Sequence, residues 1–186
     1  MLHRRTVLAL LASATAGPAF TQGAGMSRIS AHTFSFTALD GGSIELSAHA
    51  GKPILVVNTA SQCGFTPQLA GLEELWRRFG EKGLLVVGVP SNEFDQEPGD
   101  AAAIVETAHG KYGVSFPIAQ KAALKGPAAH PFYRWAAAEQ PEQTPRWNFH
   151  KYLVGHDGRL AAAFDTRVEP TDARVIEAIM RELPAN

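Results

Sequence analysis

Two runs of apolar and mostly β-branched residues stand out in the hydrophobic pattern of the chain, at residues 54–60 (ILVVNTA) and 84–90 (LLVVGVP). Runs of this kind are typical of strands that are buried on both faces of a sheet. Between the two runs, apolar residues recur at spacings of three and four, as on one helix face: Leu69, Leu72, Trp76 and Phe79. Strand, helix and strand in this order predict a parallel pair of strands joined by a crossover helix.

Residues at both ends of the helical pattern indicate where this helix begins and ends. Thr66 and Pro67 are expected to be its N-cap and first residue, because proline has no N–H to lose there and its φ is already helical. Gly80 is expected to end the helix. Glu73 lies four residues before Arg77, so we expect these two side chains to pair on the solvent-facing side.

Shorter patterns predict the rest of the fold. They indicate a hairpin of strands at 33–38 and 43–46, a helix from Asp100 toward Tyr112, an extended piece at 116–118, a helix at 130–139, a second hairpin of strands at 147–154 and 160–164, and a last helix around Val175 to Leu183. The order βαβ, helix, β-hairpin and helix predicts an α/β domain with a thioredoxin-like fold, in which helices flank a central mixed sheet.

Composition and charge narrow the functional classes. The chain has 186 residues, of which 45% are hydrophobic and 19% charged, and this is enough apolar material for one folded domain. The formal net charge is −1, without blocks of like charge. Neither a nucleic-acid partner nor a polybasic membrane anchor is therefore expected, and small substrates of low charge fit better. The apolar run from Val7 to Ala12 is too short for stable membrane insertion.

The first 24 residues have the layout of a secretory signal peptide. A basic head containing Arg4 and Arg5 precedes an apolar run from Val7 to Ala12, and small and polar residues follow. The paired arginines also resemble the twin-arginine type of signal. We expect a signal peptide at 1–24, a folded domain at 25–186 and export to the periplasm. The alternative is that Met26 is the true start, which leaves the protein in the cytoplasm.

Cys63 is the only cysteine, and it lies between the first buried strand and the crossover helix. An internal disulfide is thereby excluded. The amides at a helix start favour negative charge, but they supply roughly 0.3–1 kcal/mol, whereas keeping most of a thiol ionised at neutral pH takes about 2.7 kcal/mol. Further hydrogen-bond donors must reach the sulfur if it is reactive. The ordinary alternative is a buried, inert cysteine.

Two segments offer such donors. The loop at 91–99 (SNEFDQEPG) follows the neighbouring strand and is expected at the same edge of the sheet, and Trp147 and Asn148 stand at the start of the predicted strand at 147–154. Amide and indole N–H groups can donate to a sulfur anion and to an oxygen that leaves with negative charge.

Residues 58–68 (NTASQCGFTPQ), 88–99 (GVPSNEFDQEPG) and 147–154 (WNFHKYLV) resemble the three signature segments of the glutathione peroxidase family, in the family's order. The resemblance extends from about Thr33 to Leu183. It implies that Cys63 is the peroxidatic residue, in place of the selenocysteine of some members, and that it attacks the peroxide O–O bond and becomes a sulfenic acid. It also implies that Gln96, Trp147 and Asn148 complete a catalytic tetrad.

The chain departs from the family pattern in three places. The loop at 91–99 is one residue shorter than usual, with Glu93 at the place of a common glutamine. Relatives often carry a resolving cysteine near the positions of Ala108 and His109, and this chain has none. The stretch from Pro117 to Trp147 lacks the insertion by which tetrameric members associate. We therefore expect a monomer with an open site, which admits lipid hydroperoxides as well as hydrogen peroxide.

The function predicted from these features is that of a thiol-dependent peroxidase. No cofactor is expected apart from the reducing co-substrate, which is either glutathione or a thioredoxin-like protein. One alternative is a peroxide sensor or redox relay that uses the same cysteine with slow turnover, and another is a silent binding module. Dithiol oxidoreductase and copper chaperone functions need a second cysteine, and the scattered histidines do not suggest a metal site.

Several neighbouring residues are interpreted as structural. Asn58, Glu93, Pro98 and Gly99 are expected to shape the turns around the site, and Lys151 to be an exposed lysine on a strand.

Overall fold

The computed structural model describes residues 29–185, so the predicted signal peptide at 1–24 lies outside the described residues. The strands are β1 (Ser35–Thr37), β2 (Ser43–Glu45), β3 (Ile54–Thr59), β4 (Leu85–Pro90), β5 (Lys151–Val154) and β6 (Leu160–Phe164). The α-helices are α1 (Gln68–Phe79), α2 (Ala101–Val105), α3 (Pro131–Glu139) and α4 (Ala173–Glu182). A π-helical stretch, Glu106–Lys111, continues α2, and single 3-10 turns lie at Ala31–Thr33, Leu46–His49 and Pro141–Gln143.

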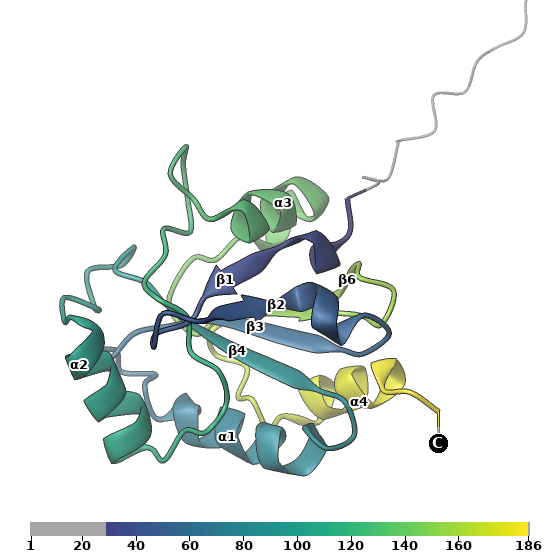
Figure 1. Cartoon of the computed structure of the whole chain (residues 1–186), viewed down its shortest axis with the longest axis horizontal. Coiled ribbons are helices and arrows are strands. Elements are labelled where there is room, and N and C mark those ends of the chain that lie inside the picture. The colour runs from purple at the N-terminus through teal and green to yellow at the C-terminus, as the bar shows by residue number, and fades with distance from the viewer. Residues whose placement is uncertain (1–28, 186) are drawn as a thin grey trace, which may run out of the picture.

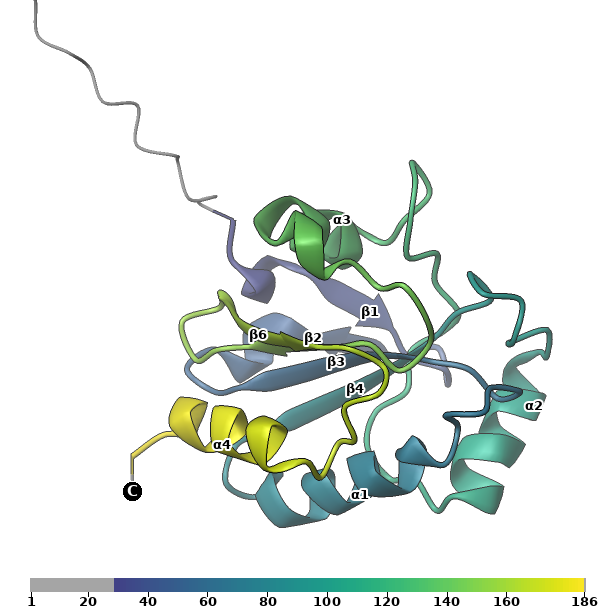
Figure 2. The same cartoon turned by 180° about the vertical axis from the view of Figure 1, so that it is seen from behind.

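The central sheet is mixed and has the strand order β4-β3-β5-β6. β3 is parallel to β4 and antiparallel to β5, and β5 and β6 form an antiparallel hairpin. Helices α1 and α4 cover one face of this sheet, while α3 and the β1-β2 hairpin cover the other (Figures 1 and 2). The thioredoxin-like α/β architecture expected from the sequence is confirmed.

Strand β3 is buried on both faces, as its apolar run predicts. Leu55 and Val57 pack into the core under α1 and α4, whereas Ile54 and Val56 pack toward α3 and the β1-β2 hairpin. Successive side chains of a strand point to opposite faces, so a strand between two layers needs apolar residues at every position. This burial holds the carboxyl end of β3, which leads to Cys63, firmly in place.

The smaller elements agree with the sequence patterns apart from their ends. β1 and β2 form the predicted antiparallel hairpin, and residues near Ile118 make single bridges to Gly88 and Ala38. The segment at 147–150, however, precedes β5 and is not part of it. Phe149 has a φ of +63°, which is incompatible with an extended strand, so the predicted strand begins four residues late.

Two charged side chains expected on the surface are buried. Glu73 pairs with Arg77 at 2.7 Å as predicted, but its carboxylate also accepts hydrogen bonds from the backbone N–H (2.7 Å) and hydroxyl (2.8 Å) of Ser115. Lys151 is fully buried, and its Nζ donates to Phe149 O at 2.6 Å. Both predictions were wrong because partners distant in sequence, or an irregular turn, provide polar contacts inside the fold.

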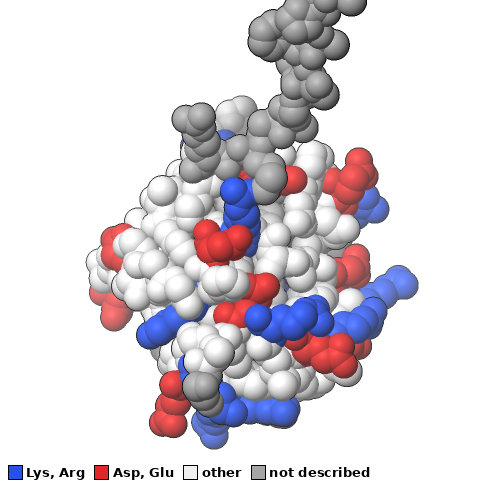
Figure 3. All heavy atoms as spheres, turned by 90° about the vertical axis from the view of Figure 1, so that its right-hand side faces the viewer, with Lys and Arg blue, Asp and Glu red and all other residues white. Residues whose placement is uncertain are grey.

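The exposed charges do not gather into large regions of one sign on the face shown in Figure 3, where acidic and basic side chains are interspersed. None of the helices within residues 29–185 is long and apolar enough to cross a membrane. The same residues contain no group of three or more His, Cys, Asp or Glu side chains arranged to hold a metal ion.

Candidate active site

Cys63 lies in the turn between β3 and α1, at the carboxyl edge of the parallel strands, and only 7% of the residue is exposed. Its Sγ accepts a hydrogen bond from the backbone N–H of Phe65 at 3.4 Å. Helix α1 begins later, at Gln68. An amide of the turn, and not of the helix itself, is therefore the direct partner of the sulfur.

Thr66 is not the N-cap of α1, contrary to the prediction. Its Oγ1 accepts from the N–H of Cys63 at 3.1 Å and lies 2.7 Å from Cys63 O and 2.9 Å from Ala60 O, to either of which it can donate its single proton. All of these contacts of the Thr66 hydroxyl are with residues that precede α1, so the hydroxyl does not cap the helix. Thr66 closes the loop that carries the sulfur, and this is a role that the sequence pattern did not indicate.

Gln96 and Asn148 are brought together across 52 residues of sequence, since Asn148 Nδ2 donates to Gln96 Oε1 at 2.9 Å. The backbone of Gln96 also joins the cysteine turn, because its carbonyl accepts from Gln62 N–H at 3.0 Å. Asn148 is fully buried, and its Oδ1 has no hydrogen-bond partner within the described chain. A buried amide oxygen without a hydrogen-bond partner costs free energy, and Asn58 and Gln68 carry such an oxygen as well.

Trp147 is 40% exposed beside this pair, and its ring lies 5.3 Å from that of Phe94 between centroids. Lys125 Nζ in turn lies 4.4 Å from the centre of the Phe94 ring. No hydrogen bond to Sγ from the side chains of Gln96, Trp147 or Asn148 occurs within residues 29–185. The structure gathers the predicted residues near the cysteine turn, and their role as donors to sulfur stays a prediction.

Glu97 anchors the loop at 91–99 to the cysteine turn, a role that the sequence did not indicate. Its Oε2 accepts from the N–H (2.8 Å) and the hydroxyl (2.9 Å) of Ser61, and its own N–H donates to Asn92 Oδ1 at 2.9 Å. Burial raises the pKa of this carboxyl, although the bonds from Ser61 oppose the shift. Ser61 and Glu97 each lie within two residues of a predicted site residue, and this was the one signal available.

Two further predictions concern residues around this loop. Asn58 was interpreted as structural, and it does bind the turn at 147–149, with Nδ2 donating to Trp147 O at 3.1 Å. Glu93 also makes a structural contact, since its carboxylate accepts from Leu124 N–H at 3.2 Å. Ala108, close to the position at which the family resemblance suggests a resolving cysteine, is buried in the π-helical stretch.

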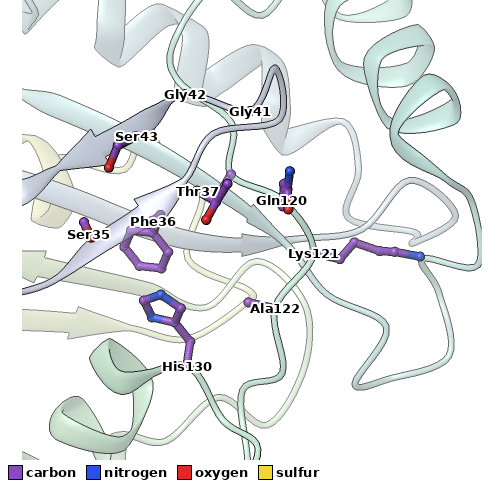
Figure 4. A pocket seen from close by; sticks show the side chains of 11 residues that line it. Ser35, Phe36, Thr37, Gly41, Gly42, Ser43, Gln120, Lys121, Ala122 and His130 are labelled. Atoms are coloured by element: carbon purple, nitrogen blue, oxygen red, sulfur yellow. The ribbon is translucent and has the colours of Figure 1, made fainter.

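A hollow of about 570 Å³ opens beside Trp147 and is lined by Phe65, Trp147, Asp165, Thr166 and Arg167. Phe65 belongs to the cysteine turn, so the hollow gives access to that region from solvent. A separate hollow of about 450 Å³ lies between β1, residues 119–122 and His130, whose ring stacks on Phe36 at 4.2 Å (Figure 4). Burial lowers the pKa of His130, but none of the four predicted site residues lines this second hollow.

The chain is similar to known proteins over most of its length. Residues 31–137 match the model of the family described as glutathione peroxidase. The hydroperoxy fatty acid reductase gpx1 of Synechocystis sp. is 40% identical over 149 residues, which are 75% of this chain and 88% of that protein. The glutathione peroxidase-like peroxiredoxin GPX5 of Chlamydomonas reinhardtii is 39% identical, over 78% of this chain and 93% of that protein.

The fold is also similar to that of solved structures. The crystal structure of Trgpx in apo form is 32% identical with a TM-score of 0.66, over 85% of this chain and 100% of that one. A thiol:disulfide interchange protein from Chlorobium tepidum has a TM-score of 0.62 at 14% identity, over 81% of this chain and 93% of that one, which shows the shared thioredoxin-family fold alone. With a family model that spans more than half of its length and relatives near 40% identity, the chain belongs to the glutathione peroxidase family.

Proposed function

We propose that this peroxidase reduces hydrogen peroxide and organic or lipid hydroperoxides through Cys63. The observation that carries the proposal is the placement of the only thiol at the edge of the sheet, in a closed turn beside the bonded pair of Gln96 and Asn148. The helix start that follows and the N–H of Phe65 both favour a negative charge on the sulfur.

In the oxidative half-reaction, the Cys63 thiolate attacks the terminal oxygen of the hydroperoxide. The O–O bond breaks, the sulfur gains an OH group and becomes a sulfenic acid, and the other oxygen leaves as hydroxide or alkoxide and takes up a proton. The peroxide gains two electrons and the sulfur loses two. The N–H groups of Gln96, Trp147 and Asn148 are the donors proposed to stabilise the charge on the sulfur and on the leaving oxygen.

In the reductive half-reaction, an external thiol attacks the sulfenic sulfur. Water leaves, a mixed disulfide forms, and a second thiol then releases Cys63. The full sequence holds no second cysteine that could resolve the sulfenic acid within the chain. We infer that glutathione or the dithiol of a thioredoxin-like protein supplies both electrons.

Lipid hydroperoxides are proposed as substrates for two reasons. A relative at 40% identity is a hydroperoxy fatty acid reductase, and the hollow beside the cysteine turn has the aromatic rings of Phe65 and Trp147 in its wall. Such rings can cover part of an acyl chain, while the hollow stays open to solvent for small peroxides.

Rapid mixing with peroxide tests the proposal. Wild-type protein should be oxidised by hydrogen peroxide and by a fatty acid hydroperoxide, with one sulfenic acid formed per chain, and Cys63→Ser should not react. Steady-state assays with glutathione and with thioredoxin then identify the reductant. Oxidation of Cys63→Ser at the wild-type rate, or an inert wild type, would exclude this cysteine as the peroxidatic residue.

A peroxide sensor or relay is the second candidate, and the lack of a resolving thiol is the observation that favours it. Such a protein is oxidised rapidly but turns over slowly with either reductant. Its partner would become disulfide-linked to Cys63 after peroxide treatment of cells, and mass spectrometry of that adduct separates the two candidates.

The protein is further proposed to be exported to the periplasm, on the pattern of residues 1–24.

A further inference from the structure

The turn at 147–149 is held in place by side chains from three other parts of the fold. Its residues precede β5, so the sheet ladder does not satisfy their carbonyl groups. Each of the three consecutive carbonyls instead accepts from one side chain: Asn58 Nδ2 to Trp147 O (3.1 Å), Thr166 Oγ1 to Asn148 O (2.7 Å) and Lys151 Nζ to Phe149 O (2.6 Å). We call Asn58, Thr166 and Lys151 the carbonyl clamp.

The turn needs such support because its backbone is strained. Phe149 has a φ of +63°, and a bulky residue in this left-handed region typically costs about 1–3 kcal/mol. The Phe149 ring is fully buried, and its N–H donates to Asn58 O at 2.6 Å. A conformation of this cost persists only where the surrounding contacts fix it, and the clamp supplies contacts on every carbonyl of the turn.

Lys151 is a costly member of the carbonyl clamp, because burying a charged side chain costs free energy. The side chain is fully buried, and burial lowers its pKa to about 8, with Glu169 and Asp165 opposing the shift. A methionine would fill the same space without a buried charge. What a methionine could not supply is the hydrogen bond that Nζ donates to Phe149 O.

Thr166 connects the turn to the helix that follows the cysteine. Its hydroxyl donates to Asn148 O, and its own carbonyl accepts from Gln68 Nε2 at 2.7 Å. Gln68 is the first residue of α1, directly after the turn that contains Cys63. A continuous path of hydrogen bonds therefore runs from the start of α1 through Thr166 and Asn148 to Gln96.

We propose that Thr166 and Lys151 are positioning residues of the peroxidase reaction, which set the direction of the Asn148 amide relative to Cys63. The inference rests on the proposed function of Cys63. Neither residue need touch the peroxide, because each acts through the carbonyl that it holds. A peptide plane freed from its clamp can rotate, and donors displaced by a fraction of an ångström lose much of their effect on a developing charge.

The test compares matched substitutions at Thr166 by the rate at which hydrogen peroxide oxidises Cys63. Thr166→Val has the same shape without the donor, and we expect at least about fivefold slower oxidation, whereas Thr166→Ser keeps the hydroxyl and should stay within about twofold of wild type. Thr171→Val is the control, because Thr171 lies in the same segment between β6 and α4 as Thr166. This variant should keep the wild-type rate. Thermal unfolding of every variant establishes that the fold is intact.

A double-mutant cycle separates positioning from general loss of stability. In an Asn148→Ala background the amide to be positioned is absent, so Thr166→Val should slow oxidation by less than about twofold more. Lys151→Met is the second variant, for the case that Thr166→Val does not fold. It should also slow oxidation at least about fivefold in the wild-type background and by less than about twofold more in the Asn148→Ala background.

The proposal is overturned if Thr166→Val and Lys151→Met react at the wild-type rate, or if either slows the Asn148→Ala protein by as much as it slows the wild type. It is equally overturned if Thr166→Ser is as slow as Thr166→Val. Failure of the proposed function has a different result, since wild-type protein would then not react with peroxide or Cys63→Ser would react equally well.

Discussion

Cys63 is contacted by neutral groups, a backbone N–H on its sulfur and the Thr66 hydroxyl on its backbone. Hydrogen bonds to a charged group are worth about 1.5–3 kcal/mol each, more than a helix start supplies. Two or three such donors are sufficient to hold a thiolate without a neighbouring cation. At the residue scale, reactivity is therefore expected to depend on how many N–H groups reach the sulfur when substrate binds.

Removal of the Trp147 indole or of the Asn148 amide should slow the oxidative step. Trp147→Phe and Asn148→Ala each delete a group worth about 1.5 kcal/mol or more, so we expect about tenfold or greater loss in the rate of Cys63 oxidation, with the fold intact. Rapid mixing with hydrogen peroxide measures this rate. Trp76→Phe, a tryptophan change on α1 far from the turn at 147–149 in sequence, is the control. If both site variants react like wild type, the tetrad assignment is wrong, although family membership stands.

His150 should make stability depend on pH. Burial lowers its pKa to about 4, below the unfolded value near 6.5, so the unfolded chain binds the extra proton more readily. The stability contributed by the neutral imidazole is complete above about pH 6.5 and is lost as the pH falls toward 4, by on the order of 3 kcal/mol in total. Urea unfolding at about pH 7.5 and about pH 5 measures the loss.

The matched variant for this prediction is His150→Gln, which does not titrate in that range. Other groups titrate equally in both proteins, among them Glu97, so the difference between the two pH profiles isolates His150. Parallel profiles between about pH 7.5 and about pH 5 would contradict the assignment.

At the scale of the element, the turn between β3 and α1 is the unit that presents the sulfur. Thr66 holds this turn from inside, and Glu97 holds it from the loop that follows β4. The two contacts come from different segments and hold different residues of the turn, Cys63 and Ser61. Together they restrict the position of the sulfur. This rigidity is what a site needs if its donors must meet a sulfur within a narrow range of geometry.

Thr66→Val should weaken this element. The change leaves the Cys63 N–H without its acceptor and removes a hydroxyl that is buried, which costs about 1–3 kcal/mol. Chemical denaturation should show this loss in the free energy of unfolding, and Thr66→Ser should recover most of it. A Thr66→Val protein as stable as wild type would mean that water or another group replaces the hydroxyl.

At the scale of the whole molecule, sheet topology gathers the site. β3 and β4 are parallel and end at the same edge, where the cysteine turn and the loop at 91–99 begin. β5 is antiparallel to β3 and therefore starts at that edge, which brings the turn at 147–149 to the same place. Three segments distant in sequence thus meet at the carboxyl edge of the parallel pair, where open α/β sheets commonly bind ligands.

The oligomeric state is a prediction at this scale. Because the stretch from Pro117 to Trp147 lacks an insertion for association, we expect a monomer, with a mass of 19.9 kDa for the full chain and less after removal of the predicted signal peptide. Sedimentation equilibrium over a range of protein concentrations measures it. A stable dimer or tetramer would contradict the expectation of a monomer.

Local patterns predicted much of this fold correctly. The run at 54–60 became β3, the spacing from Leu69 to Phe79 became α1, and Asp100 caps α2 with its carboxylate accepting from Ala103 N–H. Such features depend on residues a few positions apart, so a period of two or of 3.6 is sufficient to find them. The place of the only thiol between a buried strand and a helix was likewise readable from the chain.

The sequence by itself thus determined the layers of the fold, the edge where the chemistry gathers and the one atom available as a nucleophile. Only the tertiary structure decided that Glu73 and Lys151 are buried, that Thr66 closes a turn and does not cap a helix, and that Asn148 bonds to Gln96. The physical reason is distance along the chain. A polar group is stable inside a protein when a partner meets it there, and that partner is found by folding, as Glu73 finds Ser115 across 42 residues.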